Sequence, residues 1–307
     1  MKEKVIALGF FDGVHLGHAA LLRRTVEEAA RRGVTPAVFT FDRPPKEVLT
    51  GTPCPLINSP EDRKDLVQRL FGIREVLMVP FDHEMMTTPW DDFVTNILVG
   101  RYHAVHLVAG HDHHFGHKNQ GSPELLMEKC RELGLGCDII PKVEVGGITV
   151  SSTYIRRLVE MGQIERANRF LGHPHVLTGT VRHGRGLGSS RLFPTANLII
   201  PPHVLVPSHG VYVTRATLED GSSYAAVTNV GTRPTVNSGS DITVEACLLD
   251  FQGDLYGKTL RVEFYEHLRQ EIRFDSLEAL RAQIQADADA TRAYFADGVP
   301  MFSAGGH

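Results

Sequence analysis

GFFDGVHLGH, residues 9–18, follows a short apolar run and opens a segment with helical periodicity. Parallel α/β sheets bind ligands at the carboxyl ends of their strands, and the start of a helix offers free backbone N–H groups to phosphate. The glycines at 9, 13 and 17 let the backbone bend and approach a ligand closely. His15 and His18, three residues apart, can both donate to one anion. A lone HxxH pattern is more often structural, but this context favours a phosphate-handling turn.

The residues on both sides of this turn repeat one pattern up to about residue 142. Each repeat is a short apolar run, a turn and a helix-period segment, which indicates a parallel sheet. The second helix is predicted to start at Ser59 and Pro60 and to end at Gly72. The apolar runs, expected to be strands buried on both faces, are residues 5–8, 37–41, 76–79, 105–109 and 138–140.

The pattern of predicted secondary structure changes in the second half of the chain. Closely spaced β-rich segments run from residue 175 to about 266 and are separated by turn residues, which predicts a small antiparallel barrel. Ser276 is expected to cap a final helix. The predicted fold class is therefore α/β, with a Rossmann-like parallel-sheet domain at residues 1–170. A small antiparallel β-barrel with a terminal helix is expected at residues 171–307.

Bulk composition limits the function classes. The 307 residues suit two domains of ~100–200 residues each. A formal net charge of -4 without a dense Lys/Arg run argues against nucleic acid as a partner. No signal peptide or membrane span is apparent, so we expect a cytoplasmic protein that does not engage membranes. Cys54, Cys130, Cys137 and Cys247 show no zinc spacing and are expected to be free thiols. The sequence leaves the oligomeric state open.

A second candidate anion site lies in VSSTYIRRLV, residues 150–159. Hydroxyls at Ser151, Ser152 and Thr153, with Arg156 one turn later, suit a helix start that holds phosphate. An ordinary helix start with a solvated arginine is an equally good interpretation of the segment alone. Two anion-holding helix starts in one α/β domain would indicate a nucleoside triphosphate.

A histidine cluster lies between these two segments. His111, His113, His114 and His117 fall within seven residues and would bind a transition metal if the backbone made them converge. Solvent-exposed or substrate-facing histidines are the more common outcome in a loop, with only adventitious nickel or zinc binding. Whether the cluster binds any metal stays open at this point.

The β-rich half carries a third candidate site in RHGRGLGSSRLFPTANL, residues 182–198. Its glycines, among them Gly184 and Gly188, would let a loop approach phosphate. Thr195 and Asn197 are alternate residues of a strand and would project oxygen ligands to the same side, which suits Mg²⁺. A glycine-rich hairpin without chemistry is the competing interpretation.

The N-terminal motifs together resemble a known family. GFFDGVHLGH, followed about 130 residues later by SSTYIR, resembles the HxGH and ISSTxIR signatures of nucleotidyltransferases. GHDHHFGHKNQG, residues 110–121, is similar to the flavin-site pattern of bacterial bifunctional riboflavin kinase/FMN adenylyltransferases, also called FAD synthetases. Two positions depart from the pattern, since His113 replaces a Phe and FDRPP at 41–45 replaces TFDPHP.

The resemblance implies roles for single residues. His15 and His18 would be catalytic and contact the phosphates of ATP, while Ser152, Thr153 and Arg156 would hold the triphosphate tail. The flavin-binding residues that it implies are Asp112, Phe115 and Gly116. The full set that it implies for ATP in this half is Gly9, Phe10, Asp12, Gly17, Ser151, Ser152, Thr153 and Arg156.

FPTANL in the second half resembles the PTAN signature of riboflavin kinases. The resemblance implies that Thr195 and Asn197 bind Mg²⁺ and ATP, with Gly184 and Gly188 in the ATP loop. Glu245 would be the general base for the 5′-hydroxyl of riboflavin; a paired structural Glu is the alternative. This half departs from its pattern at Leu192, where a glycine is usual, and at Cys247, where a histidine is usual.

We therefore expect an enzyme of FAD biosynthesis that uses ATP, Mg²⁺ and the flavins riboflavin, FMN and FAD as its small-molecule partners. Adenylyl transfer from ATP to FMN is the first activity, and phosphorylation of riboflavin is the second. One alternative is an adenylyltransferase whose impaired kinase domain binds flavin or acts as a scaffold. Others are a flavin-responsive regulator without catalysis and a nucleotidyltransferase acting on another phosphorylated acceptor.

Overall fold

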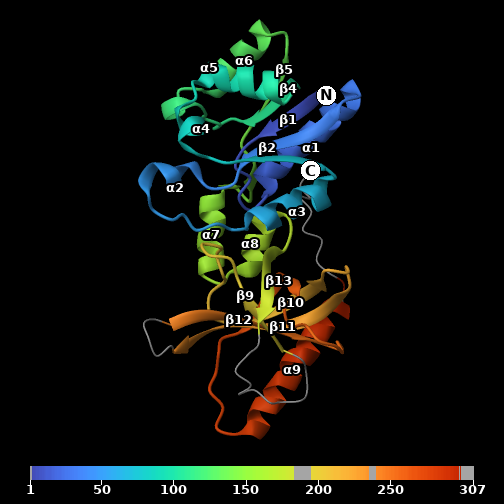
Figure 1. The fold of residues 1–307 in the computed structure, drawn as a ribbon. Helices are drawn as coiled ribbons and strands as arrows, with labels where there is room; N and C mark the ends of the chain where they lie inside the picture. The colour runs from blue at the N-terminus through green and yellow to red at the C-terminus, as the bar shows by residue number, and fades with distance from the viewer. Residues whose placement is uncertain (1, 183–194, 235–239, 297, 299–307) are drawn as a thin grey trace. The chain divides into compact units, whose positions relative to one another are not determined.

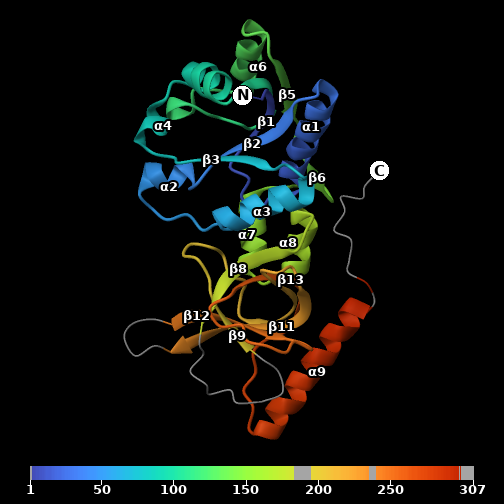
Figure 2. The same ribbon diagram turned by 45° about the vertical axis from the view of Figure 1, so that its right-hand side comes forward.

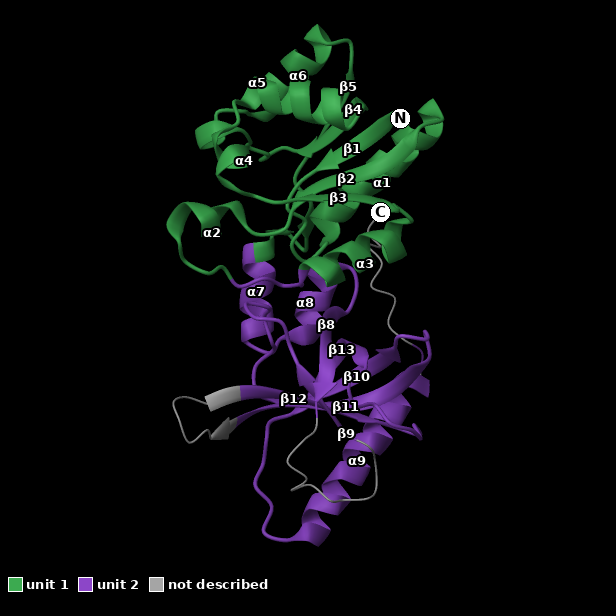
Figure 3. Cartoon of the chain, viewed as in Figure 1, with its two compact units in different colours: residues 1–54, 60–152 green, residues 55–59, 153–307 purple. Residues whose placement is uncertain are grey.

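The computed structural model describes residues 2–182, 195–234, 240–296 and 298. The chain forms two compact units, which are coloured separately in Figure 3. Unit 1 comprises residues 1–54 and 60–152, and unit 2 comprises residues 55–59 and 153–307.

Unit 1 is built on a five-stranded parallel sheet (Figure 1). The strand order is β3-β2-β1-β4-β5, so the chain builds the sheet outward from β1 in one direction and then crosses to the other side at β4. All five apolar runs predicted from the sequence are strands. Their bounds are β1 (Lys4–Leu8), β2 (Thr35–Phe41), β3 (Glu75–Val79), β4 (Ala104–Gly110) and β5 (Gly136–Ile140).

Helices cover both faces of this sheet. On one face α1 (Leu16–Arg32) packs against β1, β2 and β4, and α3 (Pro60–Phe71) packs against α1 and β3. On the other face the π-helix η1 (Phe93–Arg101) and α6 (Pro123–Glu132) share a hydrophobic core with the sheet. The shorter elements are α2 (Pro45–Thr50), α4 (His83–Thr87), α5 (Trp90–Asp92), η2 (His117–Asn119), β6 (Glu144–Val145) and β7 (Ile148–Thr149).

Unit 2 contains a closed six-stranded antiparallel barrel in the order β10-β11-β12-β9-β8-β13, and the long helix α9 (Leu277–Ala296) runs alongside it (Figure 2). Ser276 caps α9 as predicted, because its hydroxyl accepts from the N–H of Ala279. Two helices precede the barrel, α7 (Ser152–Glu160) and α8 (Ile164–Leu171). The barrel strands are β8 (His175–Arg182), β9 (Thr195–Ile199), β10 (Gly210–Leu218), β11 (Ser223–Pro234), β12 (Ser240–Leu248) and β13 (Thr259–Arg269).

Alternation along β9 and β12 separates the barrel core from its outer face. Ala196, Val244 and Ala246 are buried in the hydrophobic interior. The residues between them, such as Thr195 and Glu245, point to the opposite side because successive strand residues face opposite ways. The predicted α/β fold with a terminal barrel is confirmed. The division of function at residues 170/171 stays a prediction.

Candidate functional sites

The turn between β1 and α1 has an unusual backbone. Phe11, Gly13 and Val14 have φ values of +58°, +83° and +41°. A β-branched residue such as Val14 rarely adopts a positive φ, and conformations of this kind concentrate where function requires them. A 3.0 Å hydrogen bond from the backbone N–H of Val14 to the carbonyl of Phe11 closes this turn. The turn is therefore a fixed and strained feature of unit 1.

His15 acts as the N-cap of α1. Its Nδ1 accepts a 3.3 Å hydrogen bond from the backbone N–H of His18, the role usually taken by Ser, Thr, Asp or Asn. Because Nδ1 is the acceptor, the proton of a neutral His15 ring belongs on Nε2. The two rings are stacked, with centroids 3.6 Å apart and planes 10° from parallel. The structure thus places both imidazoles side by side at the start of α1, and their contact with a phosphate stays a prediction.

His18 is held in its neutral form. Burial lowers its pKa well below the usual value, and the nearby charges of His15 and Arg63 lower that pKa further. Its buried Nδ1 finds no hydrogen-bond partner among the residues that the structure describes. A neutral imidazole with an unsatisfied ring nitrogen is suited to receive a polar ligand.

Ser152 ties the second predicted anion segment to the turn. Its hydroxyl donates to the carbonyl of Asp12 at 2.9 Å, and the Asp12 side chain is buried. Ser151 and Ser152 belong to unit 1, as does the turn. Thr153 and Arg156 follow in the same helix, α7, and the boundary between the two compact units falls between Ser152 and Thr153.

Arg63 is a residue of this site that the sequence analysis missed. Its guanidinium is only 1% exposed and donates to the carbonyls of Phe10 and Phe41. An arginine inside a charged stretch such as PEDRKD suggests a solvated helix face, so only the packing of α3 reveals it.

The strand order places two loops beside each other at the carboxyl edge of the sheet. β1 and β4 are neighbours, and the chain leaves them in opposite directions, which makes this the topological switch point where open α/β sheets bind ligands. The turn at residues 9–15 follows β1, and the loop at residues 111–121 follows β4. The phosphate motif and the flavin-like motif therefore follow neighbouring strands at the same edge of the sheet.

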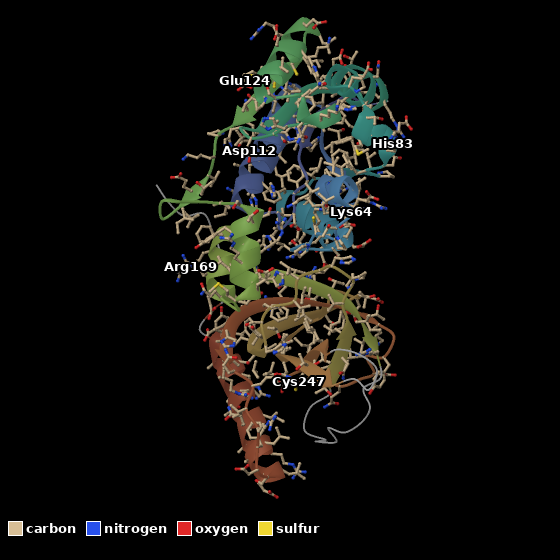
Figure 4. The ribbon with its side chains drawn as sticks, turned by 90° about the vertical axis from the view of Figure 1, so that its left-hand side faces the viewer. Lys64, His83, Asp112, Glu124, Arg169 and Cys247 are labelled. Carbon is tan, nitrogen blue, oxygen red and sulfur yellow. The ribbon has the colours of Figure 1, made fainter. Side chains whose placement is uncertain are left out.

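The loop after β4 is closed on itself around an aromatic side chain. Phe115 exchanges two backbone hydrogen bonds with Gly121, of 3.2 Å and 2.9 Å, and its ring is buried. Gly116 has a φ of +73°, and a Cβ there would lie 2.5 Å from the Cα of Trp90, so no other residue fits. Asp112, labelled in Figure 4, is exposed.

The histidines of this loop do not converge on one point, and His111 Nδ1 lies 4.0 Å from the carboxylate of Asp112. His113 stacks on Phe115, with centroids 5.4 Å apart, and burial lowers the pKa of His113 to about 4. His114 Nδ1 lies 3.0 Å from the carbonyl of Asp112, and His117 Nδ1 lies 3.4 Å from the carbonyl of Thr87. Within the described ranges, no three His, Cys, Asp or Glu side chains form a group able to hold a metal ion.

The site of unit 2 is a row of side chains across the outer face of the barrel. Asn197 of β9 pairs in register with Glu245 of β12, which pairs with Asn229 of β11. In the next row Thr195 pairs with Cys247, labelled in Figure 4. The predicted residues Thr195, Asn197 and Glu245 thus meet on one face. Asn229 was not predicted, because cross-strand register cannot be seen in a single motif.

A cavity of about 270 Å³ lies over this face and is bounded by α9. Arg269 and Asp287 form a bidentate ion pair at one side of it, with N–O distances of 2.7–3.2 Å, and Gln283 also donates to Asp287. The cavity is lined by Thr195, Val211, Val227, Asn229, Glu245, Cys247, Arg269, Glu271, Ile272, Phe274, Leu280, Ile284, Asp287 and Ala288. Its mixed apolar and polar lining suits a small organic molecule.

The departure at Cys247 has a clear physical consequence. Burial raises the pKa of its thiol to about 12, so the group is neutral at physiological pH. It therefore adds no charge beside Glu245. Gly184, Gly188 and Leu192 lie outside the described residues.

Comparison with known proteins gives a match for each unit's site. The family model for FAD synthetase matches residues 1–154, and the model for riboflavin kinase matches residues 171–295. Proteins called bifunctional riboflavin kinase/FMN adenylyltransferase are similar over nearly the whole chain. The one from Listeria monocytogenes is 34% identical and the alignment covers 96% of this chain and 93% of the relative. The one from Pseudomonas fluorescens is 37% identical, with 94% and 92% covered.

A solved structure has the same fold. The crystal structure described as a macrolide-efflux protein from Streptococcus pneumoniae has a TM-score of 0.81 and 30% sequence identity, and 94% of each chain is covered. In the described part of this chain, no helix has the length and apolar content that crossing a bilayer requires. With both family models and full-length relatives in agreement, the chain belongs to the family of bifunctional riboflavin kinase/FMN adenylyltransferases.

Proposed function

We propose that the chain makes FAD from riboflavin in two ATP-dependent steps, with adenylyl transfer in unit 1 and phosphorylation in unit 2. The observation that carries the proposal is the match of each family model to a part of the chain with a suitable site. In unit 1 the stacked histidines lie at the switch point of the sheet, and in unit 2 the Asn197–Glu245 row lies under a cavity.

In adenylyl transfer, a phosphate oxygen of FMN attacks the α-phosphorus of ATP. The bond from that phosphorus to the bridging oxygen breaks, and pyrophosphate leaves. His15 and His18 donate ring N–H groups to the α-phosphate as charge builds up on it, and the start of α1 adds backbone N–H groups. No protein nucleophile is needed, so catalysis rests on positioning and electrostatic stabilisation.

We further propose ligand positions in unit 1. ATP contacts Gly9, Phe10 and Asp12 of the strained turn and Gly17 of α1, together with the serines at 151 and 152. The flavin lies against the neighbouring loop, where Asp112, Phe115 and Gly116 contact it. The proximity of the two loops at the β1–β4 switch point supports this arrangement. Thr153 and Arg156 are proposed to hold the triphosphate tail on the evidence of their motif alone.

In the kinase step, Glu245 accepts the proton of the riboflavin 5′-hydroxyl while that oxygen attacks the γ-phosphorus of ATP and ADP leaves. Thr195 and Asn197 present hard oxygens on the same barrel face, which fits a Mg²⁺ ion. Thr195 and Asn197 would hold the ion, and a Mg²⁺ bound there would supply positive charge against the phosphates of ATP. The ring system of riboflavin occupies the cavity under α9.

The remaining parts of the proposal concern organisation and location. We assign residues 1–170 to the adenylyltransferase and residues 171–307 to the kinase. Mg²⁺ is proposed for both steps, and a cytoplasmic location is proposed from the ATP requirement and the free cysteines.

A product assay tests the proposal. Purified chain is incubated with MgATP and either riboflavin or FMN, and the flavins are separated by chromatography. FMN and then FAD should appear from riboflavin, and FAD from FMN. Turnover of FMN alone would instead support the adenylyltransferase with an impaired kinase domain. No turnover of either flavin refutes both.

A further inference from the structure

Among the residues that the structure describes, Arg63 is the largest fully buried side chain. Burial of a guanidinium is costly unless its donors are satisfied, and here both Nη atoms donate while the buried Nε finds no acceptor among the described residues. Nη1 donates to the carbonyl of Phe10 at 2.6 Å, and Nη2 donates to the carbonyl of Phe41 at 2.7 Å. The guanidinium also lies 4.3 Å from the centroid of the Phe10 ring. The side chain is therefore fixed by three interactions with backbone and ring.

The two carbonyls lie at the edge of the sheet where ligands bind. Phe41 is the last residue of β2, and Phe10 lies two residues beyond the end of β1. The Phe10 carbonyl also accepts from the hydroxyl of Thr40 at 3.0 Å, so it is held from two sides. Phe11, which follows directly, is the first residue of the turn with a positive φ. The orientation of the Phe10 peptide thus sets the start of the turn that ends at His15.

The charge of Arg63 also reaches the catalytic residues. Burial lowers the pKa of Arg63 to about 10, while Asp12, Asp42 and Glu61 counteract this effect, so the side chain is a cation at pH 7. That cation contributes to lowering the pKa of His18, after burial and the charge of His15. One buried group therefore has both a geometric and an electrostatic connection to the stacked pair.

We propose that Arg63 is a positioning residue for adenylyl transfer, whose guanidinium clamps the Phe10 and Phe41 carbonyls and so aligns His15 and His18 for ATP. This inference rests on the proposed function of unit 1. Arg63 contacts no reacting atom and acts through the turn. Its fixed charge also favours the neutral form of His18 before ATP binds.

The test compares Arg63→Met and Arg63→Lys with Arg69→Met, a matched control on the same helix. Arg69 is partly exposed and its contact with Asp65 is a surface ion pair of 3.4 Å. Lys64, labelled in Figure 4, marks the position of α3. For Arg63→Met we expect kcat/KM for FMN adenylylation to fall roughly 100-fold, since misplacing a catalytic group by ~1 Å has that effect. Arg63→Lys keeps the charge but cannot donate to both carbonyls at once, so its kcat/KM for the same reaction should fall at least ~10-fold.

A second measurement separates positioning from general damage. NMR titration of the His18 ring should give a higher pKa in Arg63→Met than in the wild type, and an unchanged pKa in Arg63→Lys and Arg69→Met. Phosphorylation of riboflavin by the same preparations should stay within about twofold of wild type, because Arg63 is not part of unit 2.

The outcomes distinguish this inference from the proposed function. If the wild type does not adenylylate FMN, the proposed function of unit 1 is wrong, and the role of Arg63 falls with it. If the wild type is active and both Arg63 variants match it in kcat/KM and His18 titration, the inference alone is overturned. If Arg63→Met does not fold, Arg63→Lys decides: wild-type adenylylation by that variant overturns the clamp.

Discussion

Replacing Gly17 by Ala tests the stacked histidines without removing either of them. Gly17 is the second residue of α1, and its backbone needs no positive φ. An added Cβ would lie 3.0 Å from Cε1 and 3.1 Å from Nδ1 of His15. Contacts that short require the ring to move by a few tenths of an ångström, on the order of the tolerance of a catalytic group. The atom displaced is also the acceptor of the N-cap hydrogen bond.

The expected effects on stability nearly cancel. Ala in place of Gly stabilises a helix by about 0.5–1 kcal/mol. Weakening the cap costs roughly 0.5–2 kcal/mol. The free energy of unfolding of Gly17→Ala should therefore change by about 1 kcal/mol or less. Its kcat/KM for FMN adenylylation should fall roughly 10- to 100-fold, because the Nε2–H of His15 no longer points to the α-phosphate.

Pyrophosphate release with FMN as acceptor measures this activity, and urea unfolding measures stability. Gly100→Ala is the matched control, since its Cβ would meet only the Thr95 carbonyl at 3.4 Å within another helix of unit 1. Phosphorylation of riboflavin is the internal control. Wild-type adenylylation by Gly17→Ala would show that the stacked arrangement has no part in the reaction.

Three further predictions concern other residues. His18→Ala should abolish adenylylation and leave the kinase step, and Glu245→Gln should do the reverse; loss of both activities in either variant would contradict separate sites. A hydrogen bond from Arg31 holds the pKa of the buried Glu28 well below its usual range. The ionised Glu28 carboxylate therefore stabilises the fold at any pH above its unfolded pKa of ~4.3, and this stabilisation is lost as the pH falls below that value. Glu28→Gln should be less stable than wild type at pH 7, and the difference should shrink below pH ~4. A difference in urea unfolding that does not change with pH argues against this. Asp287→Asn should raise the KM for riboflavin and lower the free energy of unfolding by about 1–3 kcal/mol, because it removes the negative charge that faces a partly buried arginine; unchanged KM and stability would exclude the ion pair as a wall of the cavity.

Local patterns in the sequence predicted the elements that local physics determines. The five apolar runs became the five strands of the parallel sheet, and the turn at residues 9–18 brought His15 and His18 together. Arg63 and Asn229 escaped prediction for a common reason. Their roles depend on which residues the fold brings beside them, through the packing of α3 in one case and the strand register in the other.

Motif spacing also could not show how the histidine loop is used. His111 to His117 suggested a possible metal site, but the backbone around Phe115 and Gly116 turns the rings towards different partners. Such features arise from the path of the backbone in three dimensions.

Because successive residues of β12 face opposite sides, residues that line the cavity can be substituted without changing the residues that pack the barrel interior. Apolar side chains of β12 fill the interior of the barrel, whereas Glu245 and Cys247 of the same strand face the cavity outside it. A library that randomises Cys247 and Val227, its neighbour on β11, should therefore yield mostly folded proteins with an altered substrate range.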